Sequence, residues 1–337
     1  MHGALLDLPL VPPEAQLHPL IRFTGGKTWL VPFLRTGIRQ RLAAHDGARY
    51  LEPFAGGIAV GLYIGWPTTI ATDLAPGLIE LYRSVQRAPA DTVTACTAVA
   101  DDYCLSDTHE TPAHGYYGAR CEWNASKPNG RVAPRRAAIL LYMIARGYNG
   151  LYRVNRAGAW NVPEGRKADG TPMVFDPAAI GDDLRVFAAT TAAWDFRCGD
   201  FEQTIDEARA CDTIFADPPY TDIGAQQATR MFTGYTPGGF NSADQARLAN
   251  ALARARDRGA VVVHTNADAP SIRDLYSVRG FWTLPTAELR AVNRDAKGRR
   301  RKPCLIVTSH PEVIGLPEEE SIAAVSVGTA REQLTFG

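Results

Sequence analysis

Short apolar segments that alternate with helical segments constrain the fold of this chain most strongly. The apolar segments have the length of strands and lie at residues 49–52, 68–71, 194–198, 212–216, 260–264 and 304–308. Apolar residues recur at helical spacing at 59–65, 78–85 and 242–258. For the last of these helices we expect Ser242 as the N-cap and Gly259 as the stop. This alternation predicts an α/β fold, a Rossmann-like, mostly parallel, doubly wound sheet with helices on both faces.

Residues 88–193 interrupt the alternation. They hold a polar stretch at 101–130, one strong helix at 134–145 and then a segment rich in Gly, Arg and Asn. We therefore predict a discontinuous sheet domain (1–87 and 194–310), an inserted, mainly helical domain (88–193) and a C-terminal tail (311–337).

The composition excludes several classes of protein. With 337 residues, 45% of them hydrophobic, the chain can bury a sizeable core. Its 36 Lys and Arg balance its 36 Asp and Glu, so any basic surface must be local. The longest apolar run, 137–145, is far shorter than the roughly 20 residues of a membrane span. The N-terminus does not read as a secretory signal and the six cysteines form no CxxC pair, so we expect a cytoplasmic protein without a disulfide framework.

The tetrapeptide Asp217-Pro218-Pro219-Tyr220 follows directly on the predicted strand 212–216. In open α/β sheets, ligands bind just beyond the carboxyl ends of strands. The two prolines have no N–H donor, which leaves the Asp217 carboxylate and the Pro218 carbonyl as acceptors beside the ring of Tyr220. Such a rigid pair of acceptors suits the exocyclic amino group of a nucleobase and strengthens its hold as the nitrogen becomes tetrahedral. An ordinary turn at a strand end is the alternative explanation.

A second loop, Glu52-Pro53-Phe54-Ala55-Gly56-Gly57, also follows a predicted strand, and Asp73 ends the next strand. An acidic residue at that place is suited to bind ribose hydroxyls. Ile58 stands where a GxG pattern would have its last glycine, and no full GxGxxG exists, which argues against a dinucleotide. A nucleoside cofactor without phosphate, S-adenosylmethionine, fits better. A Gly-Gly pair after a strand also occurs in turns without a ligand.

The segment Phe23-Thr24-Gly25-Gly26-Lys27-Thr28 is similar to a phosphate-binding loop but lacks the first glycine, because Ile21 occupies that position. We therefore reject an NTPase. We interpret the segment as a lid in which Phe23 stacks on a ring and Lys27 meets the carboxylate of the cofactor.

In this order, the motifs resemble the Dam-type (group α) DNA adenine-N6 methyltransferases, which depend on S-adenosylmethionine. The resemblance covers nearly the whole chain. It is carried by residues 23–27, 52–57, Asp73, Gly199-Asp200-Phe201, residues 217–220 and, in the insertion, residues 146–163. It implies that the insertion is a DNA target-recognition domain. Phe23 stands where the family often has Trp, and Ile58 where it often has Gly.

The resemblance also implies roles for individual residues. The catalytic residues would be Asp217, Pro218, Pro219 and Tyr220. The cofactor-binding residues would be Phe23, Gly26, Lys27, Glu52, Phe54, Gly56, Asp73, Asp200, Phe201 and Asp217. The DNA-binding residues would be Arg22, Tyr148, Asn149, Gly150, Arg153, Asn161, Pro163, Arg299 and Arg300.

The residue types of the insertion agree with that implication. Arg153 can bond a guanine edge with two hydrogen bonds, and Asn149 suits adenine or a backbone phosphate. Tyr148 has the shape to fill the stack that a flipped base leaves. A structural Gly-rich loop is the alternative.

Seven Lys and Arg between 290 and 302 form a local basic patch that suits phosphates, or a solvated loop. Cys104, His109, His114 and Cys121 match no established zinc spacing, so we expect no metal.

We therefore predict a site-specific enzyme that moves a methyl group from S-adenosylmethionine to the N6 amino group of an adenine flipped out of duplex DNA, in a GATC-like site. Expected partners are double-stranded DNA and, in a restriction-modification system, a restriction endonuclease for the same site. We expect a monomer of prokaryotic or phage type. Cytosine-N4 methylation of DNA, methylation of RNA or of a protein amide, and an inactive nucleic-acid-binding relative remain as alternatives.

Overall fold

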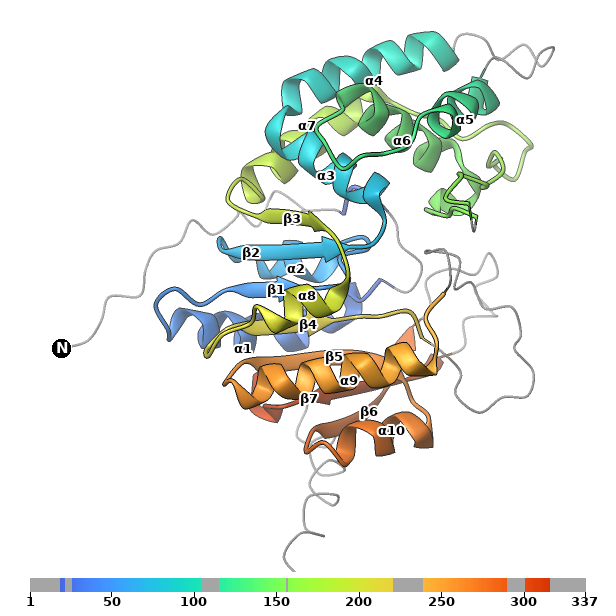
Figure 1. Cartoon of the computed structure of the whole chain (residues 1–337). Helices are drawn as coiled ribbons and strands as arrows, with labels where there is room; N and C mark the ends of the chain where they lie inside the picture. The colour runs from blue at the N-terminus through green and yellow to red at the C-terminus, as the bar shows by residue number, and fades with distance from the viewer. Residues whose placement is uncertain are drawn as a thin grey trace, which may run out of the picture.

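A seven-stranded sheet runs through the middle of the molecule (Figure 1). The structure, a computed structural model, describes residues 19–21, 26–104, 115–155, 157–220, 239–289 and 301–315. The strands are β1 (Tyr50–Glu52), β2 (Thr69–Asp73), β3 (Asp195–Cys198), β4 (Thr213–Ala216), β5 (Val261–Ala267), β6 (Trp282–Leu289) and β7 (Arg301–Thr308). Their order is β3-β2-β1-β4-β5-β7-β6, and β7 alone among these strands runs antiparallel to the other six. The predicted mostly parallel α/β sheet is confirmed.

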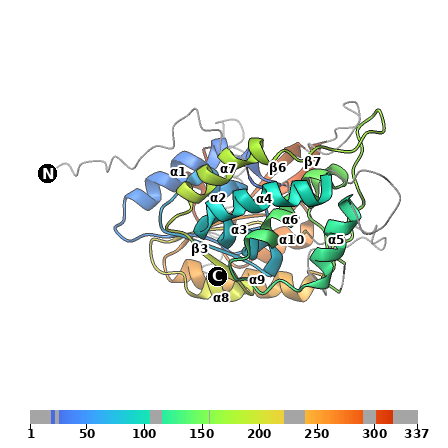
Figure 2. The same cartoon turned by 90° about the horizontal axis from the view of Figure 1, so that it is seen from above.

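Two of the hydrophobic cores lie on opposite faces of this sheet, because successive side chains of a strand point to opposite sides. In β4, Ile214 joins one core and Phe215 the other; in β5, Val262 and Val263 divide in the same way. The first core packs under α8 (Phe201–Asp206), α9 (Ser242–Asp257) and α10 (Pro270–Ser277). The second packs under α1 (Val31–Ala43) and α2 (Ala59–Ile64). Figure 2 shows α1 and α2 on one side of the sheet and α8 and α9 on the other.

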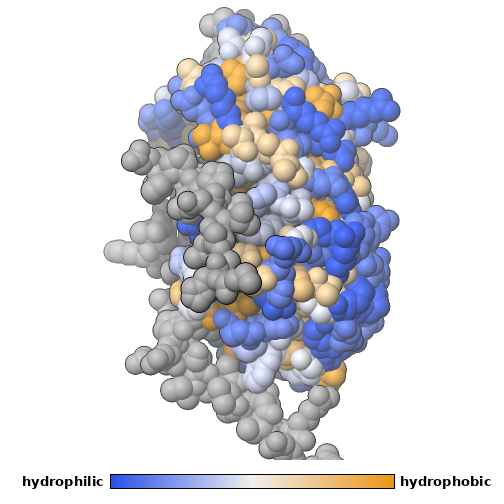
Figure 3. Space-filling model, turned by 90° about the vertical axis from the view of Figure 1, so that its left-hand side faces the viewer, coloured by the Kyte–Doolittle hydropathy of each residue, from blue (hydrophilic) through white to orange (hydrophobic). Residues whose placement is uncertain are grey.

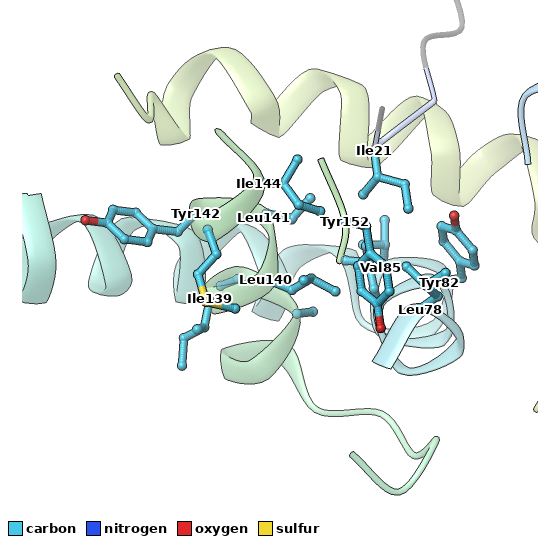
Figure 4. Close-up of a cluster of buried hydrophobic side chains, with 14 of the residues drawn as sticks. Ile21, Leu78, Tyr82, Val85, Ile139, Leu140, Leu141, Tyr142, Ile144 and Tyr152 are labelled. Carbon is cyan, nitrogen blue, oxygen red and sulfur yellow. The ribbon is translucent and has the colours of Figure 1, made fainter. Parts of the chain in front are cut away.

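A third core lies beyond the β3 edge, where the insertion packs (Figures 1 and 4). Its helices are α3 (Pro76–Arg87), α4 (Pro89–Cys104), α5 (Gly115–Ala125), α6 (Pro134–Arg146) and α7 (Pro177–Thr190). Leu78, Tyr82 and Val85 of α3 contact the same buried cluster as Leu140 and Leu141 of α6. One continuous core therefore joins α3 to the inserted helices.

The remaining regular elements are short 3-10 turns: η1 (Thr28–Leu30), η2 (Tyr148–Gly150) and η4 (Pro311–Val313). The prediction of Ser242 as the cap of α9 is wrong. Asn241 is the N-cap, because its Oδ1 accepts the N–H groups of Ala243 and Asp244 while the Asp244 side chain accepts the Asn241 N–H. The division into domains at residues 87 and 193 stays a prediction.

The surface on the face seen in Figure 3 is mostly hydrophilic, with hydrophobic residues in small scattered groups. None of the helices in the described residues has both the length and the apolar character to cross a membrane.

Candidate active site

The Asp217 carboxylate lies at the carboxyl end of β4 and is held from two sides. Its Oδ1 accepts a hydrogen bond of 2.6 Å from Thr265 Oγ1, on β5. The same oxygen is 3.1 Å from Lys27 Nζ, whose side chain is 3% exposed. The buried β4 strand thus delivers Asp217 to an edge where a neighbouring strand and the Gly26-Lys27 segment both reach it.

Tyr220 closes this corner three residues later. Lys27 Nζ lies 4.9 Å from the centre of its ring, a cation–π distance. The Tyr220 hydroxyl lies 3.5 Å from Cys304 Sγ, on β7. Lys27 therefore contacts both ends of the tetrapeptide Asp217–Tyr220, and its contact with the carboxylate of a cofactor stays a prediction.

The loop after β1 and the end of β2 are bound to each other through Asp73. Asp73 Oδ2 accepts the Gly56 N–H and Oδ1 accepts the Ala75 N–H, both at 2.8 Å. Burial raises the pKa of the Asp73 carboxyl above its usual value. Tyr82 of α3 donates its hydroxyl to the Gly56 carbonyl. The two predicted cofactor loops therefore form one assembly at adjacent strand ends.

Ile58 follows this loop with φ +50°, in the left-handed region that glycine normally occupies. A β-branched residue is rarely found there. The loop thus keeps the backbone turn that the missing glycine would have given, at the cost of local strain, and the Ile58 side chain is buried in the third core.

Three aromatic rings pack together at the loop that follows β1. Phe54 stacks on Phe201 at 5.1 Å, and the edge of Phe240 meets Phe54 at 5.9 Å. Asp200 caps α8 by accepting the Glu202 N–H at 2.9 Å and also accepts Arg247 Nη2 at 2.7 Å. The structure thus brings the predicted residues Phe54, Asp200 and Phe201 together, and adds Phe240, which no sequence motif marks.

Glu52 is buried under the same loops and is 3% exposed. Burial raises its pKa to about 8, and the nearby Asp217 charge adds to the rise. The Tyr50 hydroxyl donates to Glu52 Oε2 at 3.2 Å. Gly61 of α2 permits this close packing, since a Cβ there would lie 2.5 Å from Glu52 Oε2. The carboxyl is therefore protonated at neutral pH.

A hairpin in the insertion carries the other predicted residues. Gly147 pairs with Glu164 and Val154 with Trp160, both antiparallel, and the Tyr148 N–H donates to the Pro163 carbonyl at 2.9 Å. The structure thus brings Tyr148, Asn149, Gly150, Arg153, Asn161 and Pro163 onto one hairpin.

Within that hairpin, Arg153 and Asn161 contact each other directly. Arg153 Nε donates to Asn161 Oδ1 and Nη2 to the Asn161 carbonyl, each at 2.8 Å. Tyr148 is 47% exposed, and Asn149 has φ +57°. The arginine is oriented by its neighbour, and the tyrosine ring stands out from the surface.

Helix α5 fixes the hairpin to the insertion. Trp160 Nε1 donates to the Tyr116 hydroxyl at 2.8 Å, and that hydroxyl donates to the Val162 carbonyl at 3.0 Å. At the base of the hairpin, Arg146 Nη2 lies 2.8 Å from Glu164 Oε1, and both side chains are largely buried. These contacts tie the hairpin to α5 and to the end of α6.

Several predictions fall outside the described residues: Arg22, Phe23, Arg299, Arg300, His109, His114 and the side chain of Cys104. Within the described ranges, no group of three or more His, Cys, Asp or Glu is arranged to hold a metal ion.

Comparison with known proteins decides the family. A family model described as D12 class N6 adenine-specific DNA methyltransferase matches residues 23–292. The chain belongs to this family. The predicted resemblance to adenine methyltransferases is confirmed, and with it the class of enzyme, an adenine-specific DNA methyltransferase.

Individual relatives of this methyltransferase agree with the family model. A DNA N-6-adenine-methyltransferase of Escherichia phage P1 is 31% identical over 84% of this chain, which spans only 34% of that relative. The type II methyltransferase M.MjaIII of Methanocaldococcus jannaschii is 30% identical over 85% of this chain and 96% of its own length. A DNA adenine methylase of Serratia marcescens is 31% identical over 83% of this chain and 94% of its own length.

Proposed function

We propose that this chain moves a methyl group from S-adenosylmethionine to the N6 amino group of an adenine flipped out of duplex DNA. The observation that carries the proposal is the Asp217 carboxylate, which is fixed at the end of β4 with Lys27 and Thr265 on one oxygen. In the sheet order β2-β1-β4, the loop after β1 lies between Asp73 and Asp217. A methyl donor bound at Asp73 would therefore lie next to an acceptor bound at Asp217.

The chemistry of the described side chains fits this cofactor. The Asp73 carboxylate can accept hydrogen bonds from ribose hydroxyls, and the Phe54 and Phe201 rings offer apolar surface for a purine. Lys27, which is buried, can pair with a carboxylate. S-adenosylmethionine supplies, when bound, a methyl group on a positively charged sulfur. The acidic side chain of Asp73, at the end of β2, suits the neighbourhood of such a cation.

The target amino group would be held by the corner at residues 217–220. Asp217 and the Pro218 carbonyl would accept hydrogen bonds from its two N–H groups, which frees the nitrogen lone pair for attack on the methyl carbon. These contacts strengthen as the nitrogen becomes tetrahedral, so they favour the transition state over the ground state. As the nitrogen–carbon bond forms, the bond from that carbon to sulfur would break and leave a neutral thioether, and the nitrogen would lose one proton. Tyr220 stacks on the base and orients it.

The hairpin 147–164 would contact DNA around the flipped base. A base inside a duplex cannot reach a pocket, so it has to rotate out, and the exposed Tyr148 ring can fill the space that it leaves. Arg153, oriented by Asn161, can donate to a guanine edge. We extend the proposal to a GATC-like target site, and to a cognate restriction endonuclease as a partner in the cytoplasm of a prokaryote.

An Asp217→Asn variant tests the proposed catalysis. We expect kcat for methyl transfer to adenine-containing duplex DNA to fall by about 10³-fold. The substitution replaces one carboxylate oxygen, a hydrogen-bond acceptor, with an NH2 group that can only donate, and it removes the negative charge. DNA affinity should change by less than about threefold. The matched control is Asp257→Asn, an exposed carboxylate at the end of α9, which should keep full activity.

The product and its sequence context test the rest of the proposal. DNA from cells that express the chain should contain N6-methyladenine in a single short motif, read by single-molecule sequencing. Methylcytosine in the digested DNA, or full activity of Asp217→Asn, would refute the proposed reaction. Methyladenine outside GATC-like sites would refute the target sequence alone.

A further inference from the structure

Strand β5 supplies a hydroxyl to the candidate catalytic carboxylate. Thr265 lies near the carboxyl end of β5 and is fully buried, and its Oγ1 donates to Asp217 Oδ1 at 2.6 Å. Lys27 Nζ contacts the same oxygen. Among the described residues no hydrogen bond reaches Asp217 Oδ2. Because Thr265 and Lys27 both contact Oδ1, Asp217 Oδ2 is left to accept a hydrogen bond from a target amino group.

The direction of this hydrogen bond is unusual for a buried threonine. Thr308, on the neighbouring strand β7, donates its hydroxyl to the Val262 carbonyl at 2.8 Å, as buried hydroxyls commonly do. Thr265 instead donates to a side chain that is 24% exposed and that lies 48 residues away in sequence. A hydrogen bond to a charged carboxylate is also stronger than one to a neutral carbonyl.

The backbone before Asp217 is held by the residue next to Thr265. His264 Nδ1 lies 3.0 Å from the Ala216 carbonyl oxygen, and His264 Nε2 lies 3.2 Å from Asn266 Nδ2. Asn266 Nδ2 also donates to Gln245 Oε1 at 3.0 Å. An amide nitrogen only donates, so His264 Nε2 accepts and Nδ1 carries the hydrogen that is donated to Ala216.

This network is buried and neutral. His264, Asn266 and Gln245 are fully buried, and burial lowers the pKa of His264 to about 3, so the ring carries no charge at neutral pH. Asn266 Oδ1 accepts the Ala267 N–H at 2.8 Å, which satisfies its last polar atom. The end of β4 is thus anchored rigidly at its backbone by His264, while Thr265 orients the side chain that follows.

We propose that Thr265 is a positioning residue for the methyl transfer: it holds Asp217 in the rotamer that presents Oδ2 to the target amino group, on a strand end anchored by His264. The inference rests on the function proposed above. Lys27 is also suited to pair with the cofactor, so Thr265 is the donor that stays on Asp217 throughout the reaction.

The test replaces the Thr265 hydroxyl with a methyl group of the same shape. For Thr265→Val we expect kcat to fall by about 10- to 100-fold, the usual consequence of losing one hydrogen bond to a charged group in a site. The KM values for DNA and for S-adenosylmethionine should stay within about threefold. Thr265→Ser keeps the hydroxyl and should restore kcat to within about threefold of the wild type.

Two controls separate positioning from mere stability. Thr308→Val removes a buried hydroxyl and its hydrogen bond on the adjacent strand, away from Asp217, and should keep the wild-type kcat. The double variant Thr265→Val, Asp217→Asn should be no slower than Asp217→Asn alone, because Thr265 acts through Asp217.

Each other outcome counts against the inference. It is overturned if Thr265→Val keeps the wild-type kcat, if Thr265→Ser is as slow as Thr265→Val, if Thr308→Val is equally slow, or if the two losses add in the double variant. If the wild-type chain transfers no methyl group to adenine, the proposed function fails and this inference fails with it. An active wild type with an unaffected Thr265→Val refutes the inference alone.

Discussion

The sheet and the insertion position their candidate functional residues by different means. In the sheet, Asp73 ends β2 and Asp217 directly follows β4, and they lie at one edge because parallel strands end on the same side of a sheet. In the insertion, Arg153 and Asn161 are eight residues apart and orient each other on one hairpin. Long-range topology builds the first site, and local pairing supported by α5 builds the second.

Helix α3 connects these two regions. It begins three residues after Asp73, and polar side chains further along it bind the insertion. Arg136 Nε pairs with Glu80 Oε1 at 2.6 Å, and Glu80 Oε2 accepts the Asn129 N–H at 3.1 Å. Arg83 donates to the carbonyls of Phe196, on β3, and of Gly130. The hairpin 147–164 is therefore held at a fixed place relative to the loops that end at Gly56 and Asp73.

The largest effect is expected where this connection is broken. Arg136→Ala leaves the Glu80 carboxylate buried without its cation, and removes the guanidinium that lies 4.1 Å above the Trp123 ring. We expect the free energy of unfolding to fall by about 3 to 5 kcal/mol, measured by urea denaturation.

The neighbouring Arg135 is the matched control. It pairs with Glu122 and Asp102 but is 47% exposed, so Arg135→Ala should cost no more than about 1 kcal/mol. Equal losses for Arg135→Ala and Arg136→Ala would mean that the buried pair does not join the two regions.

A smaller effect is expected from the hairpin alone. Arg153→Ala should lower kcat/KM on the preferred DNA site roughly 5- to 150-fold, which corresponds to a loss of about 1 to 3 kcal/mol of transition-state stabilisation. The free energy of unfolding should change little. Sites already altered at the base pair that Arg153 reads should lose much less, so sequence discrimination is reduced. Kinetics on a panel of duplexes with single substitutions measures this.

Two variants sharpen that result. Asn161→Ala removes the acceptor that orients Arg153 and should weaken discrimination in the same direction, by a smaller factor. Arg185→Ala removes an exposed arginine on α7 and should leave the kinetics unchanged. A uniform loss of rate on every duplex for Arg153→Ala would indicate a phosphate contact in place of base recognition.

The same contrast explains what the sequence could predict. Buried strands, the acids that follow them and the helix at 134–145 carry strong local signals, and each is found where predicted. The helices α1, α4, α5 and α7 were missed because their apolar residues leave only a weak helical period. The helices α8 and α10 and the strand β6 were also missed. The hairpin residues were found through family resemblance alone.

Residues whose role depends on a distant partner could not be predicted. Thr265 and His264 lie inside an apolar strand and read as core until β4 is placed beside them. Glu80 and Arg136 are 56 residues apart, and each alone is an ordinary charged residue on a helix. Asn241 and Ser242 are both good N-caps, and the extended backbone of Asn241 decides between them.

The last comparison follows one carboxyl of each region as pH changes. Glu52, in the sheet, has its pKa raised from 4.5 to about 8 by burial, so the native state keeps a proton that the unfolded chain loses. Stability should therefore fall as pH rises from about 4.5 to about 8, by at most about 1.4 kcal/mol per pH unit from this group. The glutamine of Glu52→Gln does not ionise, so its contribution to the free energy of unfolding should not change with pH. Glu52→Gln should therefore gain stability relative to the wild type as the pH rises across that range.

Glu122, in the insertion, should behave in the opposite way. Hydrogen bonds from Arg135 lower the pKa of its carboxyl, so its contribution is present at neutral pH and is lost as pH falls below the unfolded value. Glu122→Gln should thus be less stable than the wild type at neutral pH and approach it in acid. Urea denaturation of the three proteins at several pH values measures both differences. If the two variants shift in the same direction, burial in the sheet and ion pairing in the insertion are not what distinguishes these carboxyls.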